Sequence, residues 1–533
     1  MNIIAAISSL DIFVLIAYIV IVVALGFWAG WKQKKSNSEA KDYFLAGKSL
    51  KWPMIGFALF ATNISCVHLV SLAQSGFKGG LVMGNFEWMN AFSLIILALF
   101  FLPFYLKTGV ATLPDFLEKR YNRSCRDWLA VLSIISGIVV HIGFAFLTGG
   151  LVIKSLFGLD LYTTVIAIAL ITGLYTIYGG LAAVVWTETV QTIILLVGAA
   201  LLTWFAWDKI GGWEPLVETL QKDGSGDKLT VLRGNEDDFP WYAAFCIPVI
   251  GIWYWCTDQT IVQRALGAKD EHEAKRGALF AGFLKILPVF IIVLPGVIAY
   301  ALFLKGDFNP GTDQDAKYVY KEMIVQLLPS GLVGLMLATL LAALMSTVSG
   351  ALNSISTLFS YDLYARFKKD VSDHQLVKVG RIAAGVAMII SIAIVPLLDK
   401  YESLFEGLND IIGHIAPPIT AVFLIGVFWK GASAIAAQWT LYIGSFAGLA
   451  VFTYGKTIGH GINFMVMALF LFIFCSITLV ILSLVKPDEK PSELCWKSPL
   501  EPLRQPGKGL IGNYKVLAGV LTAIMVFLFW KFS

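Results

Sequence analysis

Charged residues are scarce in this chain: they make up 14% of its 533 residues, whereas hydrophobic residues reach 57% and the mean hydropathy is +0.75. This composition is far too apolar for a soluble protein and is typical of a polytopic membrane protein. The net charge of +4 says little about nucleic acid, because the basic residues lie in short segments between apolar runs. We therefore expect a lipid bilayer as the surrounding medium and no nucleic-acid partner.

Motifs of catalysis and metal chemistry are also missing. The six cysteines contain no CxxC pair and the six histidines no HExxH, which argues against a disulfide framework or a zinc site. The nearest phosphate motif, AGKSL at 46–50, has Asp42 where a P-loop needs its first glycine. No nucleophile has a readable histidine and carboxylate arrangement. The chain is therefore predicted not to be an enzyme, and any transport would be powered by a gradient.

Long apolar runs are abundant. A helix needs about 20 mainly apolar residues to cross a bilayer, and the hydropathy predicts an all-α protein with about fourteen spans. They lie at 10–31, 53–75, 81–106, 126–155, 161–178, 185–206, 241–262, 277–304, 331–364, 380–398, 403–428, 434–453, 463–485 and 512–531. The first run is too long for a signal segment and lacks a basic start, so we expect it to be retained.

Lysine and arginine are concentrated in every second loop. They follow the first and third spans, and recur in the segments 264–276, 366–381 and after Val485, all of which are read here as loops. Loops rich in these residues face the cytoplasm. Both termini are therefore predicted to lie outside a cell membrane, as is the acidic loop 206–240.

Spans two to six form a group of five that ends at this acidic loop, and spans seven to eleven form a second group of five after it. An odd number of spans reverses the orientation of a group, so two such groups meet the requirement for an inverted repeat with its binding site at mid-membrane. The predicted domains are 1–51 (first span and linker), 52–240 and 241–430 (the two repeats) and 431–533 (three peripheral helices).

The stretch 57–76, FALFATNISCVHLVSLAQSG, is long enough to span a membrane but carries many polar residues in its middle. Polar groups at membrane depth face a protein interior or a wet cavity, and helices are broken only there. The polar residues could equally be contacts between packed helices. This stretch alone leaves both interpretations open.

Five ionisable side chains, the first of them in this stretch, are expected at membrane depth: His68, Glu87, Glu188, Asp258 and Lys285. Each charge costs about 2.5–3.5 kcal/mol at a helix centre and so needs a partner. A glutamate and a lysine that face one cavity would offer the acceptor and the donor that a polyhydroxylated solute requires. Structural ion pairs are the alternative, above all for Glu188 and Asp258.

Hydroxyl groups and small residues crowd the helix predicted over 334–364. Ala343, Ser346 and Thr347 stand at i, i+3 and i+4 and therefore share one face. Two hydroxyls and freed backbone carbonyls would form a cage of oxygens suited to sodium. Ordinary helix packing explains the same residues.

The chain resembles the sodium/solute symporter family and, within it, the sodium/glucose (galactose) cotransporter branch. The motifs that carry the resemblance run in family order over 42–430: DYFLAGKSL, ATNIS, FEWM, IYGGLAAVVWTETVQ, WYWCTDQTIVQRALGAK, FLK, LMSTVSGALNSISTLFSYDLY and PPITAVFLIGVFWK. The resemblance implies a LeuT-type fold of 5+5 inverted repeats with extra helices. It also implies sodium-coupled import of a monosaccharide such as glucose or galactose by a chain that functions as a monomer.

Site residues follow from the same resemblance. Sodium, the coupling ion, would bind the carbonyls of Ala61, Ile64 and Ala343 and the hydroxyls of Ser346 and Thr347. The sugar would be contacted or gated by His68, Leu72, Glu87, Asn90, Tyr254, Trp255, Lys285, Phe405 and Asn409, with Asn63 holding Tyr254.

Three departures from the family pattern bear on substrate and stoichiometry. Asn409 stands where sugar carriers usually have Gln, and Gly251 where they place Thr or Asn. A second sodium site of some relatives is matched only by Glu188 with Ser346, Ser349 and Gly350, so two sodium ions are not expected. Another solute, such as myo-inositol or a different sugar, stays an alternative, as does a sugar sensor or an ion channel.

Overall fold

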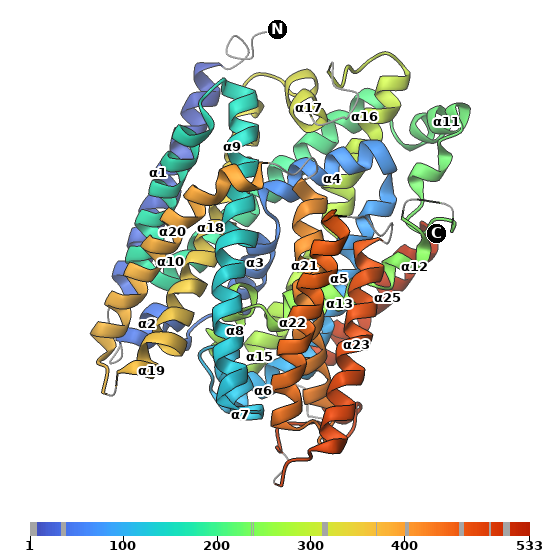
Figure 1. The fold of residues 1–533 in the computed structure, drawn as a ribbon. Coiled ribbons are helices and arrows are strands. Elements are labelled where there is room, and N and C mark those ends of the chain that lie inside the picture. The colour runs from blue at the N-terminus through green and yellow to red at the C-terminus, as the bar shows by residue number, and fades with distance from the viewer. Residues whose placement is uncertain are drawn as a thin grey trace.

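The computed structural model describes residues 8–33, 39–235, 237, 239–311, 318–368, 370–399, 404–457, 463–489, 492–504 and 512–533. Within these residues the chain forms helices that stand together in one bundle (Figure 1). The β-type pairing in the described part is limited to one isolated bridge between Leu50 and Ala268. The predicted all-α class is confirmed.

The first part of the chain forms the helices that carry one half of the site. They are α1 (Ser9–Gln33), α2 (Glu39–Leu45), η2 (Ala46–Lys48), α3 (Trp52–Asn63), α4 (Cys66–Gly79), η3 (Leu81–Gly84), α5 (Asn85–Ile96), η4 (Leu97–Phe101), α6 (Leu102–Thr108), α7 (Leu113–Arg120), α8 (Arg123–Ser136), η5 (Gly137–Gly143), α9 (Phe144–Phe157), α10 (Leu161–Ile210), α11 (Trp213–Asp223) and η6 (Gly226–Leu229).

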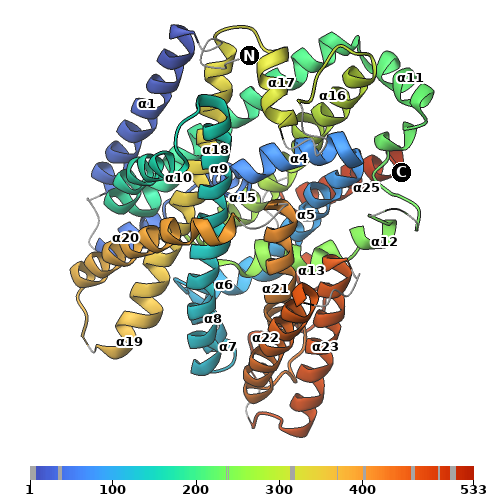
Figure 2. The same cartoon turned by 45° about the horizontal axis from the view of Figure 1, so that its top comes forward.

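The second part carries the other half of the site and the peripheral helices. It comprises α12 (Trp241–Ala244), α13 (Ile247–Ile252), η7 (Trp253–Thr257), α14 (Gln259–Leu266), α15 (Glu271–Leu284), η8 (Val289–Val293), α16 (Leu294–Leu304), α17 (Val319–Leu327), α18 (Leu332–Leu358), η9 (Phe359–Tyr364), α19 (Ala365–Phe367), α20 (Asp373–Leu398), α21 (Leu404–Phe428), α22 (Ala434–Thr457), α23 (Phe464–Val485), α24 (Glu501–Arg504) and α25 (Tyr514–Lys531). Figure 2 shows α22 and α23 at one edge of the bundle.

Fewer helices than fourteen meet the length and hydropathy expected of a membrane span. The described residues contain 11 such helices, or 12 when the bent pair α3 and α4 counts as one span. The predicted spans 161–178 and 185–206 lie in the single 50-residue helix α10, and the segment 241–262 is divided among shorter pieces. The number fourteen therefore stays a prediction.

Helix α10 is kinked at Gly180, and the kink separates the two segments that hydropathy distinguishes. Gly180 has φ 60° and ψ −155°, a conformation that side-chain-bearing residues rarely adopt. The kink frees the carbonyl of Ile177, which accepts hydrogen bonds from the Tyr43 hydroxyl (2.9 Å) and from Arg381 Nε (3.1 Å). A backbone break at the edge of the bundle is thus stabilised by side chains from α2 and α20.

Each proposed repeat begins with a broken helix. In the first, α3 and α4 meet at an angle of 64°, with Ile64 extended at φ −76° and ψ 96°. In the second, η7 and α14 are separated by Asp258, extended at φ −84° and ψ 122°. Ser65 caps α4, and the Asp258 side chain accepts a hydrogen bond from the Thr260 N–H at the start of α14. Both breaks are stabilised by polar caps, as helix ends require. The domain boundaries themselves stay a prediction.

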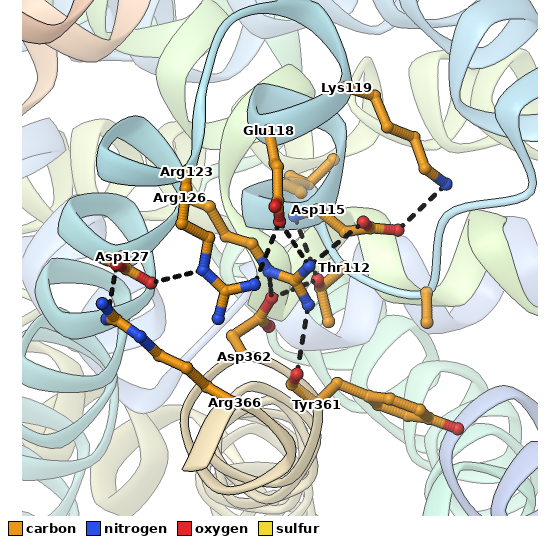
Figure 3. Close-up of polar contacts among 12 residues, drawn as sticks. Thr112, Asp115, Glu118, Lys119, Arg123, Arg126, Asp127, Tyr361, Asp362 and Arg366 are labelled. Carbon is orange, nitrogen blue, oxygen red and sulfur yellow. Dashed lines mark hydrogen bonds and ion pairs between the residues drawn. The ribbon is translucent and has the colours of Figure 1, made fainter. Parts of the chain in front are cut away.

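A cluster of ion pairs joins α7, α8 and the end of the α18–α19 helix (Figure 3). Arg126 Nε lies 2.6 Å from Asp362 Oδ1, and its Nη1 contacts Glu118 at 2.6 Å and Asp115 at 3.3 Å. Arg366 pairs with Asp127 of α8. The segment 108–123, which contains α7, is therefore attached to the second half of the chain by the ion pairs of Arg126, on the side predicted to be cytoplasmic.

Candidate functional site

The break between α3 and α4 turns backbone carbonyls toward α18. The last helical bond of α3 runs from the Ile64 N–H to the Phe60 carbonyl (2.9 Å), and the Ser65 N–H then donates to His68 Nδ1 (3.3 Å). The carbonyls of Ala61 and Thr62 are left at the end of the helix, where backbone oxygens need new partners. The polar stretch 57–76 therefore contains a break in the helix, at Ile64.

Oxygens from α3 and α18 converge beside this break. Ser346 Oγ donates to the Ala61 carbonyl at 2.8 Å and lies 3.1 Å from the Ala343 carbonyl. Thr347 Oγ1 lies 3.1 Å from the same Ala343 carbonyl and 3.4 Å from that of Thr62. Four of the five predicted sodium ligands are therefore brought together, and the Thr62 carbonyl joins them. Ile64, the fifth, occupies the break itself.

This oxygen cage consists of neutral groups, a set of hard ligands that suits a small cation. Its hydroxyls donate to its carbonyls, and a cation placed among them would replace those hydrogen bonds with its own positive charge. Among the described residues, no group of three or more His, Cys, Asp or Glu side chains could hold a metal ion. The residues present fit a monovalent cation, and their individual roles as sodium ligands stay predictions.

A cavity of about 90 Å³ lies directly beside the cage. One ordered water needs roughly 10–15 Å³ on this measure, so the cavity has room for several waters. Thr62 and Thr347 belong both to the cage and to the cavity wall. Six predicted solute contacts also lie in the wall: Asn63, His68, Glu87, Asn90, Tyr254 and Asn409.

Lys285 lies behind the cavity wall, where it ties two cavity residues together. Its Nζ donates to Asn63 Oδ1 at 2.6 Å and forms an ion pair with Glu87. Lys285 is completely buried, and Glu87 is 1% exposed. The predicted acceptor and donor for a sugar are thus already paired with each other, and the Glu87 side chain is the member that reaches the cavity.

Three other predicted solute residues are placed differently. Trp255 is fully buried, with the Lys285 Nζ 5.6 Å from its ring centroid, and it does not belong to the cavity wall. Leu72 is also fully buried and lies outside the wall. The side chain of Phe405 lies outside the described residues.

Gly251 leaves room for polar atoms at one side of the cavity. A Cβ at this position would lie 2.7 Å from Asn90 Oδ1 and 2.5 Å from Ser93 Oγ, so a side chain there would collide with both. Asn90 Oδ1 and Ser93 Oγ are buried without a hydrogen-bond partner. Buried polar atoms of this kind normally have a partner. Asn90 lines the cavity and Ser93 does not, so a solute hydroxyl in the cavity would supply a partner for Asn90 Oδ1.

His141 is a cavity residue that the sequence analysis missed. It lies on the π-helical turn η5, lines the cavity, and places its Nε2 2.7 Å from Asp258 Oδ2. Its ring centroid is 5.9 Å from that of Tyr254. Asp258 therefore has a structural partner in His141. A structural pair was the alternative to a solute contact for this residue. The sequence signal was a histidine within an apolar span, the same signal that singled out His68.

Glu188 also has a structural partner, and it is Arg264. Arg264 Nη2 lies 2.6 Å from Glu188 Oε1, both side chains are fully buried, and Thr62 Oγ1 donates to the same carboxylate at 2.8 Å. A Cβ at Gly350 would overlap the Arg264 guanidinium. The interpretation of Arg264 as a loop residue is wrong, because the side chain extends into the core. The guanidinium therefore occupies the space between Glu188 and Gly350, where the resemblance places the second sodium.

Comparison with known proteins shows the family of this chain. The sodium:solute symporter family profile matches residues 43–444. Sodium/glucose cotransporter 1 of Sus scrofa is 36% identical, with 92% of this chain and 81% of that protein covered, and the sodium/glucose cotransporter of Vibrio parahaemolyticus is 34% identical, with 91% and 92% covered.

Among solved structures, a sodium-coupled sialic acid symporter in a substrate-bound outward-open state matches with a TM-score of 0.80 at 23% identity, covering 91% of this chain and 99% of that one. This likeness confirms the predicted LeuT-type fold. The family match over most of the chain, together with the two relatives, establishes that the chain belongs to the sodium:solute symporter family.

Proposed function

We propose that the protein imports a monosaccharide by sodium-coupled symport, through alternating access. The observation that carries this proposal is the wall shared by the oxygen cage and the cavity, since Thr62 and Thr347 belong to both. An ion bound in the cage would order the break between α3 and α4. That break also positions His68, which caps α4 through Ser65 and faces the cavity.

The sugar class is supported by the relatives and by the chemistry of the cavity. The two relatives named above are called sodium/glucose cotransporters. The cavity wall offers amide, carboxylate, imidazole and phenol groups, which suit a neutral solute rich in hydroxyls. Glucose or galactose is the proposed solute, and myo-inositol or another sugar is the alternative.

The energy of one sodium ion is sufficient for this task. A monovalent charge that moves through 100 mV releases about 2.3 kcal/mol, and a tenfold concentration gradient adds about 1.4 kcal/mol. Together they support roughly 500-fold accumulation of a neutral solute. A neutral cage also permits release, because no carboxylate holds the ion on the sodium-poor side.

The full transport unit is proposed to be a single chain in a cell membrane, with both ends of the chain outside. Cage and cavity are formed from one chain, so no second copy is needed to complete them. The loops on the opposite side are rich in Lys and Arg, as expected for cytoplasmic loops.

Uptake into proteoliposomes tests the function. Labelled glucose and galactose are offered with an inward gradient of sodium, or of potassium as the control, and a panel of unlabelled solutes competes. Accumulation that requires sodium supports the proposal. Sodium-dependent uptake competed only by other solutes would change the substrate, and the absence of accumulation would favour a sensor or a channel.

A stoichiometry of one sodium per sugar follows from the Glu188–Arg264 pair, because the guanidinium already neutralises the carboxylate. The reversal potential of the sugar-dependent current should shift by about 59 mV per tenfold change in sugar gradient, the value for one charge. A shift near 30 mV would mean two sodium ions and would contradict the inference.

Thr347→Ala should weaken the dependence on sodium before it affects folding. The change removes one cage hydroxyl, which contacts the Ala343 and Thr62 carbonyls, and leaves a small residue on a helix rich in small residues. We expect the half-saturating sodium concentration to rise about tenfold, the equivalent of one lost interaction of 1.4 kcal/mol. Thr339→Ala on the same helix, eight residues before Thr347, is the matched control and should leave the half-saturating sodium concentration unchanged, because its hydroxyl contacts the Leu335 and Ile194 carbonyls.

A further inference from the structure

The final helix, α25, ends against the residue that follows Glu87. The Trp88 ring centroid lies 5.6 Å from that of Phe529 and 5.9 Å from that of Phe532. Trp88 is fully buried, and Phe290 completes its aromatic surroundings at 5.8 Å. The opposite face of α25 is exposed: Phe527 is 55% and Trp530 72% accessible. One face of this peripheral helix therefore packs against Trp88, and the opposite face is exposed.

Trp88 is itself connected to the residue beside Lys285. Its indole Nε1 donates to the Ile286 carbonyl at 3.3 Å. Helix α15 ends at Leu284, so this carbonyl lies where the regular helix is interrupted and is free to accept. Glu87 and Trp88 on α5 therefore pair with Lys285 and Ile286, and the two contacts form adjacent links between the same two segments.

A second connection runs from the end of α25 through the loop that follows α11. The Phe532 carbonyl accepts a hydrogen bond from the Val231 N–H at 2.7 Å. The Val231 carbonyl in turn accepts from Asn85 Nδ2 at 2.5 Å. Asn85 begins α5, two residues before Glu87. In Figure 1 the end of the chain lies close to α11 and α12, on the side of the bundle where α5 begins.

We propose that α25 is a positioning element for the solute site: Phe529 and Phe532 hold Trp88, and through it set the register between Glu87 and Lys285. This inference rests on the proposed sugar transport for its functional meaning. The geometry gives α25 two independent attachments to the first turn of α5, one aromatic and one through the backbone. A helix that only anchors the chain in lipid would need neither of these two attachments.

The test compares Phe529→Ala with Phe527→Ala, two residues apart on opposite faces of one helix. In proteoliposomes, Phe529→Ala should raise the KM for sugar about three- to tenfold, the range expected for one lost aromatic contact. The maximal rate per molecule and the half-saturating sodium concentration should stay within twofold. Phe529→Tyr keeps the ring and should restore the KM, and Phe527→Ala should match the wild type.

Amide hydrogen exchange gives a readout that does not need transport. Exchange in segments 85–90 and 285–288 should accelerate in Phe529→Ala and not in Phe527→Ala. If Phe529→Ala does not fold, Phe532→Leu takes its place in the test, because it removes the second aromatic ring that contacts Trp88. Unchanged exchange and an unchanged KM would overturn the inference, as would an equal effect of both alanine variants. A wild type without sodium-dependent uptake would overturn the proposed function, while the exchange comparison would still decide the role of α25.

Discussion

Replacement of Lys285 by alanine is expected to abolish sodium-dependent sugar uptake while the protein still reaches the membrane. Lys285 is completely buried and connects Asn63 to Glu87, two residues of the cavity wall. Without the ammonium group, Glu87 keeps an uncompensated buried carboxylate or takes up a proton, and either outcome removes the paired arrangement. Uptake per molecule should fall at least a hundredfold, measured beside expression and chromatographic behaviour.

A matched control separates function from stability. Lys275 lies on α15, the helix that ends just before Lys285, and is 2% exposed, but it pairs with Glu271, stacks on Tyr514 and does not belong to the cavity wall. Lys275→Ala should retain uptake. The double variant Glu87→Gln with Lys285→Ala removes both charges, so it should regain stability and remain inactive. Unchanged uptake in Lys285→Ala would mean that the lysine is only structural.

Replacement of Arg264 by alanine is expected to destabilise the protein more than any other single removal of an ion pair described here. The change leaves Glu188 fully buried without its cationic partner. Breaking a buried pair in this way typically costs about 3–5 kcal/mol. It also opens a void beside Gly350 and Thr62. The thermal midpoint in detergent should fall by several degrees, and the yield of folded protein should fall with it.

The double variant Glu188→Gln with Arg264→Gln should recover most of that loss, because neither charge is then left alone. Arg366→Ala is the control: this arginine pairs with Asp127 near the surface, where an ion pair contributes about 0–1 kcal/mol. If Arg264→Ala had the same thermal midpoint as the wild type, the Glu188–Arg264 pair would contribute no stability to the fold. The second sodium site would then need to be reconsidered.

Much of the fold could be predicted from the sequence. Segments of about 20 apolar residues partition into lipid wherever they occur in the chain, so composition alone specifies the class and most of the spans. The polar residues at 57–76 marked this span as unusual in the same way, but contacts between packed helices explained them equally well, and only the structure shows the break near Ile64. The cage face of Ala343, Ser346 and Thr347 followed from helical spacing, although its use for an ion did not.

The partners of the buried charges could not be predicted in this way. Arg264 lies two residues after the predicted span 241–262, a position that hydropathy assigns to a loop, yet its side chain turns inward to Glu188. His141 and Asp258 are 117 residues apart and meet at 2.7 Å. Which groups meet depends on the rotation and tilt of each helix, and hydropathy averaged along the chain contains neither.

By itself, then, the sequence determined that this is a helical membrane protein with one unusually polar span at 57–76 and a face of hydroxyls, because burial of apolar residues and helical periodicity are local properties. The tertiary structure decided that the Ala61 and Thr62 carbonyls meet Ser346 and Thr347, that Arg264 occupies the space beside Glu188, and that α25 supports Trp88. These contacts join residues between 76 and 441 positions apart, and only the packing of the whole bundle brings them within hydrogen-bond or van der Waals distance.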